Sequence, residues 1–158
     1  MSAEETVRDY YDALRNGEAL GPFFVDDESA VKFGISESLF GGDEVGDALR
    51  EQTETTEEWT VESHRLTVEE RDELAWFADE VTLEWTVRGD GEGDENEGGD
   101  GNRNGNGNGN GGGDDERHHF ETRWSGTLAR GRGGQDRDRT RNTEWLFHSM
   151  HVSAPQEL

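Results

Sequence analysis

The sequence contains no cysteine, only two prolines and, among its 15 basic residues, a single lysine, Lys32. The absence of cysteine excludes disulfide bonds, thiolate nucleophiles and cysteine-ligated metals. The chain also lacks an apolar run of about 18 residues, the length that would suggest a membrane span. Its first residues, MSAEETVRDYY, have neither the basic start nor the apolar core of a secretion signal. We therefore expect a cytoplasmic protein with no membrane association.

Acidic residues dominate the charge of this 158-residue chain, whose formal net charge is −23. Without residues 90–116 the chain still has 29 acidic against 14 basic residues, a net charge of −15, so the acidity is spread over the folded surface. An acid-rich, lysine-poor surface suits molar salt, where charge repulsion is screened over a few Å. We predict a halophile-adapted protein. The same charge opposes phosphate backbones and anionic lipids, so we expect neither nucleic acid nor membrane as a partner.

A single domain over residues 1–158 is the expected organisation, because the apolar residues outside the polar segments suffice for one core. Residues 89–116 are an acidic Gly/Asn-rich run without an apolar side chain, and we predict a disordered insertion there. The run lacks the ligand spacing of an EF-hand, and we predict no metal and no cofactor. A second polar loop is expected at 131–143.

Two helices are expected in the N-terminal part. Ser2 and Glu5 form a capping-box signature before a helix over 3–16, which Gly17 ends. An apolar turn at 20–25 contains glycine and proline. Apolar residues then alternate over 30–36 and predict a strand with Val31, Phe33 and Ile35 on one face. Asp43 is expected to cap a second helix that fades over 53–58.

Long strands are expected in the rest of the chain. Segments 59–68 and 74–87 predict a hairpin with a turn at 69–72, followed by strands at 120–128 and 145–153. Within 74–87 the apolar positions change from even numbers (Leu74, Trp76) to odd numbers. This change predicts a β-bulge around 78–80 that would bend the sheet. The fold class is therefore α+β.

The order of these elements resembles the SnoaL-like branch of the nuclear transport factor 2-like superfamily. The resemblance rests on segments that span nearly the whole chain outside the two loops: VRDYYDAL, FFVDD, GGDEVGDAL, ELAWFADEVTLEW, RWSGTLAR and WLFHSMHVSAP. The insertion at 89–116 departs from the compact hairpin of that family.

The resemblance implies a cone: a strongly bent mixed or antiparallel sheet wrapped around a long N-terminal helix, with an apolar pocket at the open end. Such proteins commonly form homodimers through the sheet. They include isomerases, dehydratases, cyclases and hydrolases as well as proteins that only bind or dimerise, so fold alone does not give function. We expect a protein that binds a small apolar molecule in an aromatic pocket. The alternatives are a lyase, isomerase or hydrolase that uses His or Asp for acid–base catalysis, and a non-catalytic dimerisation module.

Two histidines on the last strand are the candidate catalytic residues. His148 and His151 are three residues apart, which places them on opposite faces of a strand and excludes a shared metal. Either one could face the pocket as a general base, and the alternative is a histidine that only hydrogen-bonds a neighbouring strand. Asp26 is a third candidate, as a carboxylate base.

Aromatic residues are the candidate ligand-binding residues. The alternative for each is a place in the core or in a dimer interface. The predicted set combines tryptophans of the long strands with aromatic residues where the resemblance places the closure of the cone: Trp76, Trp85, Trp124, Tyr10, Tyr11, Phe24 and Phe33.

Overall fold

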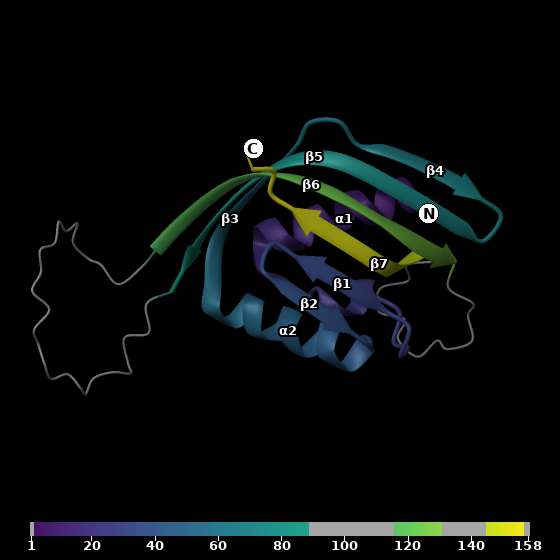
Figure 1. Cartoon of the computed structure of the whole chain (residues 1–158), viewed down its shortest axis with the longest axis horizontal. Coiled ribbons are helices and arrows are strands. Elements are labelled where there is room, and N and C mark those ends of the chain that lie inside the picture. Colours follow the sequence, from purple (N-terminus) through teal and green to yellow (C-terminus); the bar gives the residue numbers. More distant parts are fainter. Residues whose placement is uncertain (1, 89–115, 131–144, 157–158) are drawn as a thin grey trace, which may run out of the picture.

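The computed structural model describes residues 2–88, 116–130 and 145–156. The loop predicted at 131–143, and the predicted insertion apart from its last residue, lie outside the described residues. The described part is a mixed α+β structure in which two helices accompany one curved, unclosed sheet (Figure 1).

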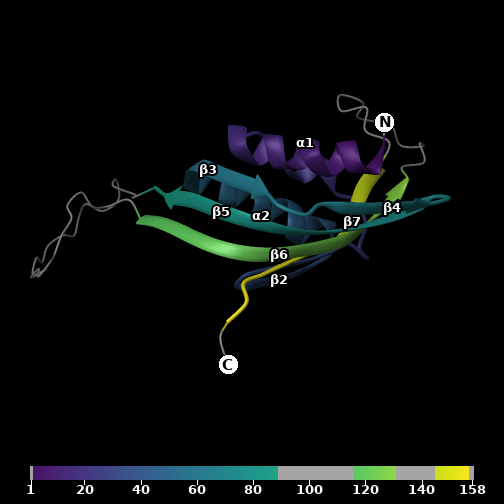
Figure 2. The same ribbon diagram turned by 90° about the horizontal axis from the view of Figure 1, so that it is seen from above.

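Helix α1 (Ala3–Asn16) begins and ends as the sequence predicts. The Ser2 hydroxyl accepts a hydrogen bond from the Glu5 backbone amide, and the Glu5 carboxylate accepts one from the Ser2 amide, both at 3.1 Å. Gly17 ends the helix in the left-handed conformation, with φ of 71°, which glycine adopts without strain. Figure 2 shows α1 lying along one face of the sheet, here called the inner face.

The sheet has seven strands: β1 (Val31–Gly34), β2 (Glu37–Phe40), β3 (Thr56–Ser63), β4 (Thr67–Arg71), β5 (Leu74–Val87), β6 (Glu116–Arg130) and β7 (Trp145–Ser153). Their order is β2-β1-β7-β6-β5-β3, and β4 pairs with β5 on the same side as β3. All pairs are antiparallel except β1 with β7. A short 3₁₀ helix, η1 (Gly21–Phe23), lies in the predicted apolar turn. Helix α2 (Gly42–Thr55) follows β2, and Asp43 lies in its first turn rather than at the cap.

The strand predicted at 30–36 is a hairpin, β1 (Val31–Gly34) and β2 (Glu37–Phe40). Val31 and Phe33 share a face of β1, as predicted, and that face is the outer one. Lys32 is only 6% exposed and faces the inner side, whereas Phe33 packs on the outer side, 5.7 Å from the rings of both Phe40 and His151. The apolar alternation of this strand therefore marks its outer side, and the buried position belongs to a charged residue.

The bulge predicted within 74–87 is wrong. Strand β5 (Leu74–Val87) pairs with β6 (Glu116–Arg130) in one uninterrupted register, from Leu74↔Ala129 to Val87↔Glu116. Odd-numbered positions face inward throughout, and Leu74 and Trp76 are 56% and 45% exposed on the outer face. Strand β6 begins before the predicted residue 120, because its first residues pair with the end of β5.

The irregularities lie on the neighbouring strands. The segment predicted as one strand at 59–68 is two, β3 (Thr56–Ser63) and β4 (Thr67–Arg71), with a register shift inside β3 between Glu57 and Thr60. On β7 (Trp145–Ser153), Ser149 pairs with Thr127 and Phe147 pairs with Leu128, which leaves His148 as an extra residue. Bulges of this kind bend a sheet, which accounts for its curvature.

The core fills the space between the inner face and α1. At its centre, the Tyr10 ring packs edge-on against Phe23, Phe24, Trp124 and Phe147, with centroids 5.3–6.2 Å apart. Its neighbour Tyr11 donates a 2.8 Å hydrogen bond to Asp79, a carboxylate that is only 4% exposed. The two adjacent tyrosines thus serve different parts of the interior.

Candidate functional site

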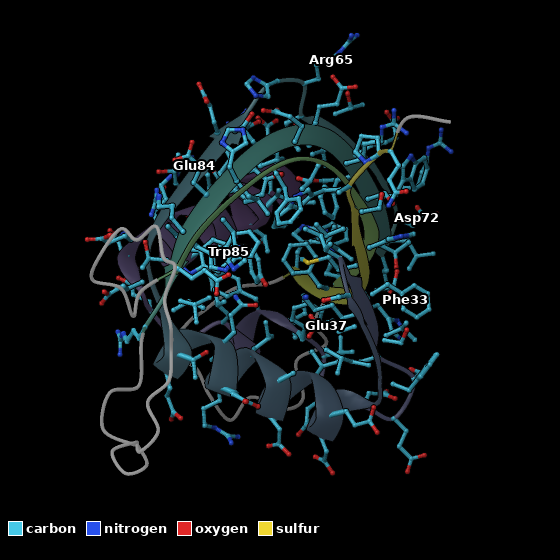
Figure 3. All side chains as sticks on the ribbon, turned by 60° about the vertical axis from the view of Figure 1, so that its left-hand side comes forward. Phe33, Glu37, Arg65, Asp72, Glu84 and Trp85 are labelled. Atoms are coloured by element: carbon cyan, nitrogen blue, oxygen red, sulfur yellow. The ribbon has the colours of Figure 1, made fainter. Side chains whose placement is uncertain are left out.

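A cavity of about 180 Å³ opens between the inner face of the sheet and the two helices. Figure 3 shows the sheet as an arch, with Trp85 and Glu37 on its inner side and Glu84 on its outer side. The lining comes from α1, α2, the β1–β2 hairpin and four strands of the sheet: Tyr10, Leu14, Lys32, Gly34, Ile35, Ser36, Glu37, Gln52, Thr56, Trp59, Leu83, Trp85, Trp124 and Val152.

Tryptophans form the apolar wall of the cavity. The rings of Trp59 and Trp85 are stacked, with centroids 4.7 Å apart and planes at 15°. The indole N–H of Trp59 donates to Thr56 at 2.8 Å, and that of Trp124 donates to Thr122 at 2.9 Å. Because their N–H groups are hydrogen-bonded within the protein, the rings of Trp59 and Trp124 offer mainly apolar surface to an occupant.

A partly buried ion pair supplies the charge in the cavity. Lys32 Nζ lies 2.8 Å from Glu37 Oε2; the Lys32 side chain is 7% exposed and the Glu37 side chain 36%. Within the described residues, Glu37 is the one hydrogen-bond partner of the Lys32 ammonium, which has three N–H donors. Because the ammonium is buried and borders the cavity, its remaining donors are available to an occupant.

The Tyr10 hydroxyl is a second unused polar group. Tyr10 is 2% exposed and lines the cavity, and its hydroxyl has no hydrogen-bond partner among residues 2–88, 116–130 and 145–156. Burial raises its pKa well above the usual value, and the negative charge of Glu37 raises it further. The hydroxyl is therefore neutral and can donate a hydrogen bond.

Gly34 makes room for the Glu37 side chain. A Cβ atom at position 34 would lie 2.6 Å from Glu37 Oε2 and 2.8 Å from its Cγ, closer than non-bonded atoms approach. Any larger residue would push the carboxylate away from Lys32. The glycine in the β1–β2 hairpin thus permits the geometry of the ion pair.

The predicted catalytic residues lie elsewhere. His148 is the bulged residue of β7, and its Nε2 lies 2.6 Å from the Ser29 hydroxyl. His151 is exposed on the outer face beside Phe33, and Asp26 is exposed in the segment before β1. None of the three lines the cavity. The inference that one histidine looks into the cone is wrong, because the bulge at His148 resets the alternation of β7.

The Ser29–His148 pair has the composition of a hydrolase dyad but not its proton arrangement. The Ser29 hydroxyl donates to Asp27 at 2.9 Å, so it accepts from the histidine and is not activated by it. The Asp27 pKa is lowered, mainly by the hydrogen bond from the Ser29 amide. The cluster closes the turn before β1.

Three of the seven predicted aromatic residues line the cavity, namely Tyr10, Trp85 and Trp124. Tyr11 and Phe24 are buried in the core, and Phe33 and Trp76 lie on the outer face. Trp59, Lys32 and Glu37 also line the cavity and were not among the predicted site residues. The one signal for Lys32 was its rarity, because it is the sole lysine of the chain.

Comparisons with known proteins identify the family. A model of the SnoaL-like domain matches residues 3–97, more than half of the chain. The chain belongs to the SnoaL-like domain family. None of the curated proteins that were compared matches this SnoaL-like domain.

Solved structures share its fold at low sequence identity. A nuclear transport factor 2-like protein from Salmonella enterica is 13% identical, with a TM-score of 0.65 over 97% of this chain and 88% of its own. A putative dehydratase of the same superfamily from Streptomyces avermitilis is 11% identical, with a TM-score of 0.66 over 98% and 94%. A ketosteroid isomerase-like protein from Erwinia carotovora is 12% identical, with a TM-score of 0.61 over 98% and 94%. These similarities show the fold alone.

The described residues of this SnoaL-like domain do not suggest two other kinds of site. Neither described helix has the length and apolarity needed to span a lipid bilayer. In the same residues, no three His, Asp or Glu side chains are grouped so that they could hold a metal ion. The cavity is therefore the feature on which a function can be argued.

Proposed function

We propose that this SnoaL-like domain binds a small, flat, mainly apolar molecule in the cavity under the arch of the sheet. The observation that carries the proposal is that the stacked rings of Trp59 and Trp85 and the partly buried Lys32–Glu37 pair line the same cavity. Flat aromatic walls favour flat ligands, and a few polar groups orient them.

The size of the cavity supports a compact ligand. About 180 Å³ is enough for one or two fused aromatic rings but not for a cofactor-sized molecule. The charges of Lys32 and Glu37 compensate each other, so the cavity requires no charged ligand. A neutral ligand with one oxygen atom can accept a hydrogen bond from Lys32 without leaving a charge uncompensated. 2-Naphthol has this shape and polarity and is a suitable probe.

The experiment measures 2-naphthol binding by thermal shift and calorimetry in concentrated KCl, a condition chosen because we also propose that the acid-rich surface is salt-adapted. Wild type is compared with Trp85→Ala and with the matched control Trp76→Ala, which removes an exposed tryptophan of the same strand. We expect the melting temperature of wild type and of Trp76→Ala to rise with ligand. Trp85→Ala should bind about fivefold more weakly, because an aromatic pair adds about 1 kcal/mol.

A wild-type melting temperature that stays constant with 2-naphthol and with related one- and two-ring aromatic molecules would overturn the proposal. Equal weakening by Trp85→Ala and Trp76→Ala would also contradict it. Circular dichroism of each variant checks that the fold is kept.

Acid–base catalysis is a second candidate function, favoured by Glu37. Its carboxylate lies in the cavity beside two groups that donate hydrogen bonds, the Lys32 ammonium and the Tyr10 hydroxyl. Such an arrangement suits a lyase or isomerase that moves a proton near a ligand oxygen. The predicted roles of His148, His151 and Asp26 would then belong to Glu37.

A homodimer stays a prediction. Three large apolar side chains on the outer surface favour it, since Phe40, Leu74 and Trp76 are 57%, 56% and 45% exposed. Sedimentation of wild type and of Trp76→Ser tests it. A monomer at all concentrations would contradict the dimer without affecting the cavity.

A further inference from the structure

Lysine is used at one position of this chain, and that position is in the cavity. The other 14 basic residues are arginines, and arginines make the exposed ion pairs, such as Arg50 with Asp47. Among the described residues Lys32 is the one buried cation. Arginine remains protonated in proteins, whereas a lysine amine can lose its proton and become a nucleophile. The one lysine of the chain, Lys32, therefore lies where a nucleophile could contact a ligand.

Building on the proposed ligand cavity, we propose that Lys32 condenses with the carbonyl group of a flat aromatic aldehyde or ketone to form a covalent imine. Two observations support this role. The Lys32 side chain is only 7% exposed and lines a cavity with aromatic walls, the desolvated setting in which lysines act as Schiff-base nucleophiles. Its ammonium lies 2.8 Å from Glu37, a carboxylate that can accept the proton which the nitrogen must lose before it attacks.

The proton balance of the step closes within the ion pair. The ammonium of Lys32 passes one proton to Glu37, and the neutral nitrogen attacks the carbonyl carbon to form a carbon–nitrogen bond. The attacking nitrogen then loses a second proton, which passes to the former carbonyl oxygen and gives the neutral hydroxyl of a carbinolamine. Glu37 returns its proton to this hydroxyl, which leaves as water. Overall, one ammonium and one carbonyl give one protonated imine and one water molecule.

Two neighbours of the ion pair support the geometry. The Tyr10 hydroxyl, buried and without a partner among the described residues, can donate a hydrogen bond to the carbonyl oxygen during the attack. Gly34 allows Glu37 to remain within reach of Lys32, because a Cβ at this position would overlap the carboxylate. Tyr10 would contact the ligand, whereas Gly34 acts only as a positioning residue.

The test is reductive trapping of the imine. The full chain is incubated with 2-naphthaldehyde and cyanoborohydride at neutral pH, and peptide mass spectrometry locates the naphthylmethyl group. The matched control is Arg50→Lys, which adds an exposed lysine to the same chain and thereby gives an internal reference. We expect Lys32 to be labelled roughly tenfold faster or more than the introduced amine, because the cavity holds the aldehyde beside it.

Variants of the ion pair extend the test. Glu37→Gln keeps the shape of the side chain but cannot accept the proton, and we expect it to slow the labelling of Lys32 roughly a hundredfold, the usual size of acid–base assistance. Gly34→Ala should slow it as well. Lys32→Arg should abolish the label at this position. Circular dichroism checks that each variant is folded.

The outcomes separate this inference from the proposed function. If 2-naphthol binds to wild type but Lys32 is labelled no faster than the introduced amine, the imine is excluded and ligand binding stands. Unchanged labelling of Lys32 in Glu37→Gln would also exclude the proposed role of the ion pair. If neither 2-naphthol nor the aldehyde binds, both proposals fall.

Discussion

Two buried charged groups lie on the inner face of the same sheet, and their surroundings differ. Asp79 on β5 accepts hydrogen bonds from the Tyr11 hydroxyl at 2.8 Å, the Ser63 hydroxyl at 2.6 Å and the Arg65 amide at 2.8 Å. Within the described part of the chain, Lys32 on β1 has one hydrogen-bond partner, Glu37, and it borders a cavity. The Asp79 site is saturated within the protein, whereas the Lys32 site keeps donors for something else.

The saturated site has a clear structural task. Strands β3 and β4 both pair with β5, and the segment between them does not. The hydrogen bonds of Asp79 hold this segment against β5. Buried polar groups are costly unless they are hydrogen-bonded, and Asp79 meets this condition within the protein. A buried charge that is saturated indicates a structural role, and one that is unsaturated beside a cavity indicates a ligand.

The largest effect is expected from Asp79→Ala. The change removes the acceptor of two hydroxyls and one backbone amide, and we expect a loss of about 3–5 kcal/mol in the free energy of unfolding. Chemical denaturation measures it. Asp47→Ala, which removes an exposed carboxylate on α2, is the control and should change stability by less than about 0.5 kcal/mol. Similar losses in the two variants would contradict a structural role for Asp79.

The adjacent tyrosines give the sharpest contrast in stability. Tyr11→Phe removes a donor to Asp79 and should cost about 1–2 kcal/mol. Tyr10→Phe removes a hydroxyl that has no partner among the described residues, and its effect should be within about 0.5 kcal/mol. Chemical denaturation of both variants checks this. An equal cost for the two would show that the Tyr10 hydroxyl is also satisfied.

A smaller effect is expected from removing the ion pair as a whole. Lys32→Met and Glu37→Leu should each cost about 1 kcal/mol, because each leaves one charge without its partner; the cost is below that of a fully buried pair since the Glu37 side chain is 36% exposed. The double variant should be close to wild type in stability, since apolar side chains replace both charges. A double-mutant cycle by chemical denaturation measures the coupling. A double variant less stable than both single variants would show that the pair holds the fold together.

The smallest effect is expected on the outer face, which serves as a reference for both interior sites. His119 lies between Glu84 and Glu121, at 2.9 and 3.0 Å, and these hydrogen bonds raise its pKa. Because the His119 pKa is higher in the folded chain than in the unfolded chain, where it is about 6.5, the protonated histidine stabilises the fold at pH values below the unfolded-state pKa. This contribution is lost as the pH rises through the folded-state pKa. His119→Gln should therefore lower the melting temperature slightly at pH 6 and not at pH 9. A difference that grows with pH would contradict this assignment.

The sequence predicted the parts of the fold that local patterns determine. The capping box, the apolar stripe and the terminal glycine define α1, and alternation locates the long strands. The family resemblance also pointed to an aromatic pocket, and Tyr10, Trp85 and Trp124 do line the cavity.

The faces of two strands could not be read from the same patterns. In β1 the apolar residues Val31 and Phe33 lie on the less buried side, so alternation concealed Lys32. In β7 the bulge at His148 changes the alternation partway, and no local sequence signal marks it. Both features depend on pairing with distant strands, which a local pattern does not contain. The Lys32–Glu37 pair therefore became visible only in the structure.

The affinity of Tyr10→Phe and Tyr11→Phe for 2-naphthol separates the cavity from the structural site around Asp79. We expect Tyr10→Phe to weaken binding about 2- to 10-fold, the contribution of one hydrogen bond, and to leave the free energy of unfolding nearly unchanged. We expect the reverse for Tyr11→Phe, which should lose stability and bind 2-naphthol as wild type does. If Tyr11→Phe weakened 2-naphthol binding as much as Tyr10→Phe, or if Tyr10→Phe left binding unchanged, the division into a structural site around Asp79 and a ligand-binding site around Lys32 would be wrong.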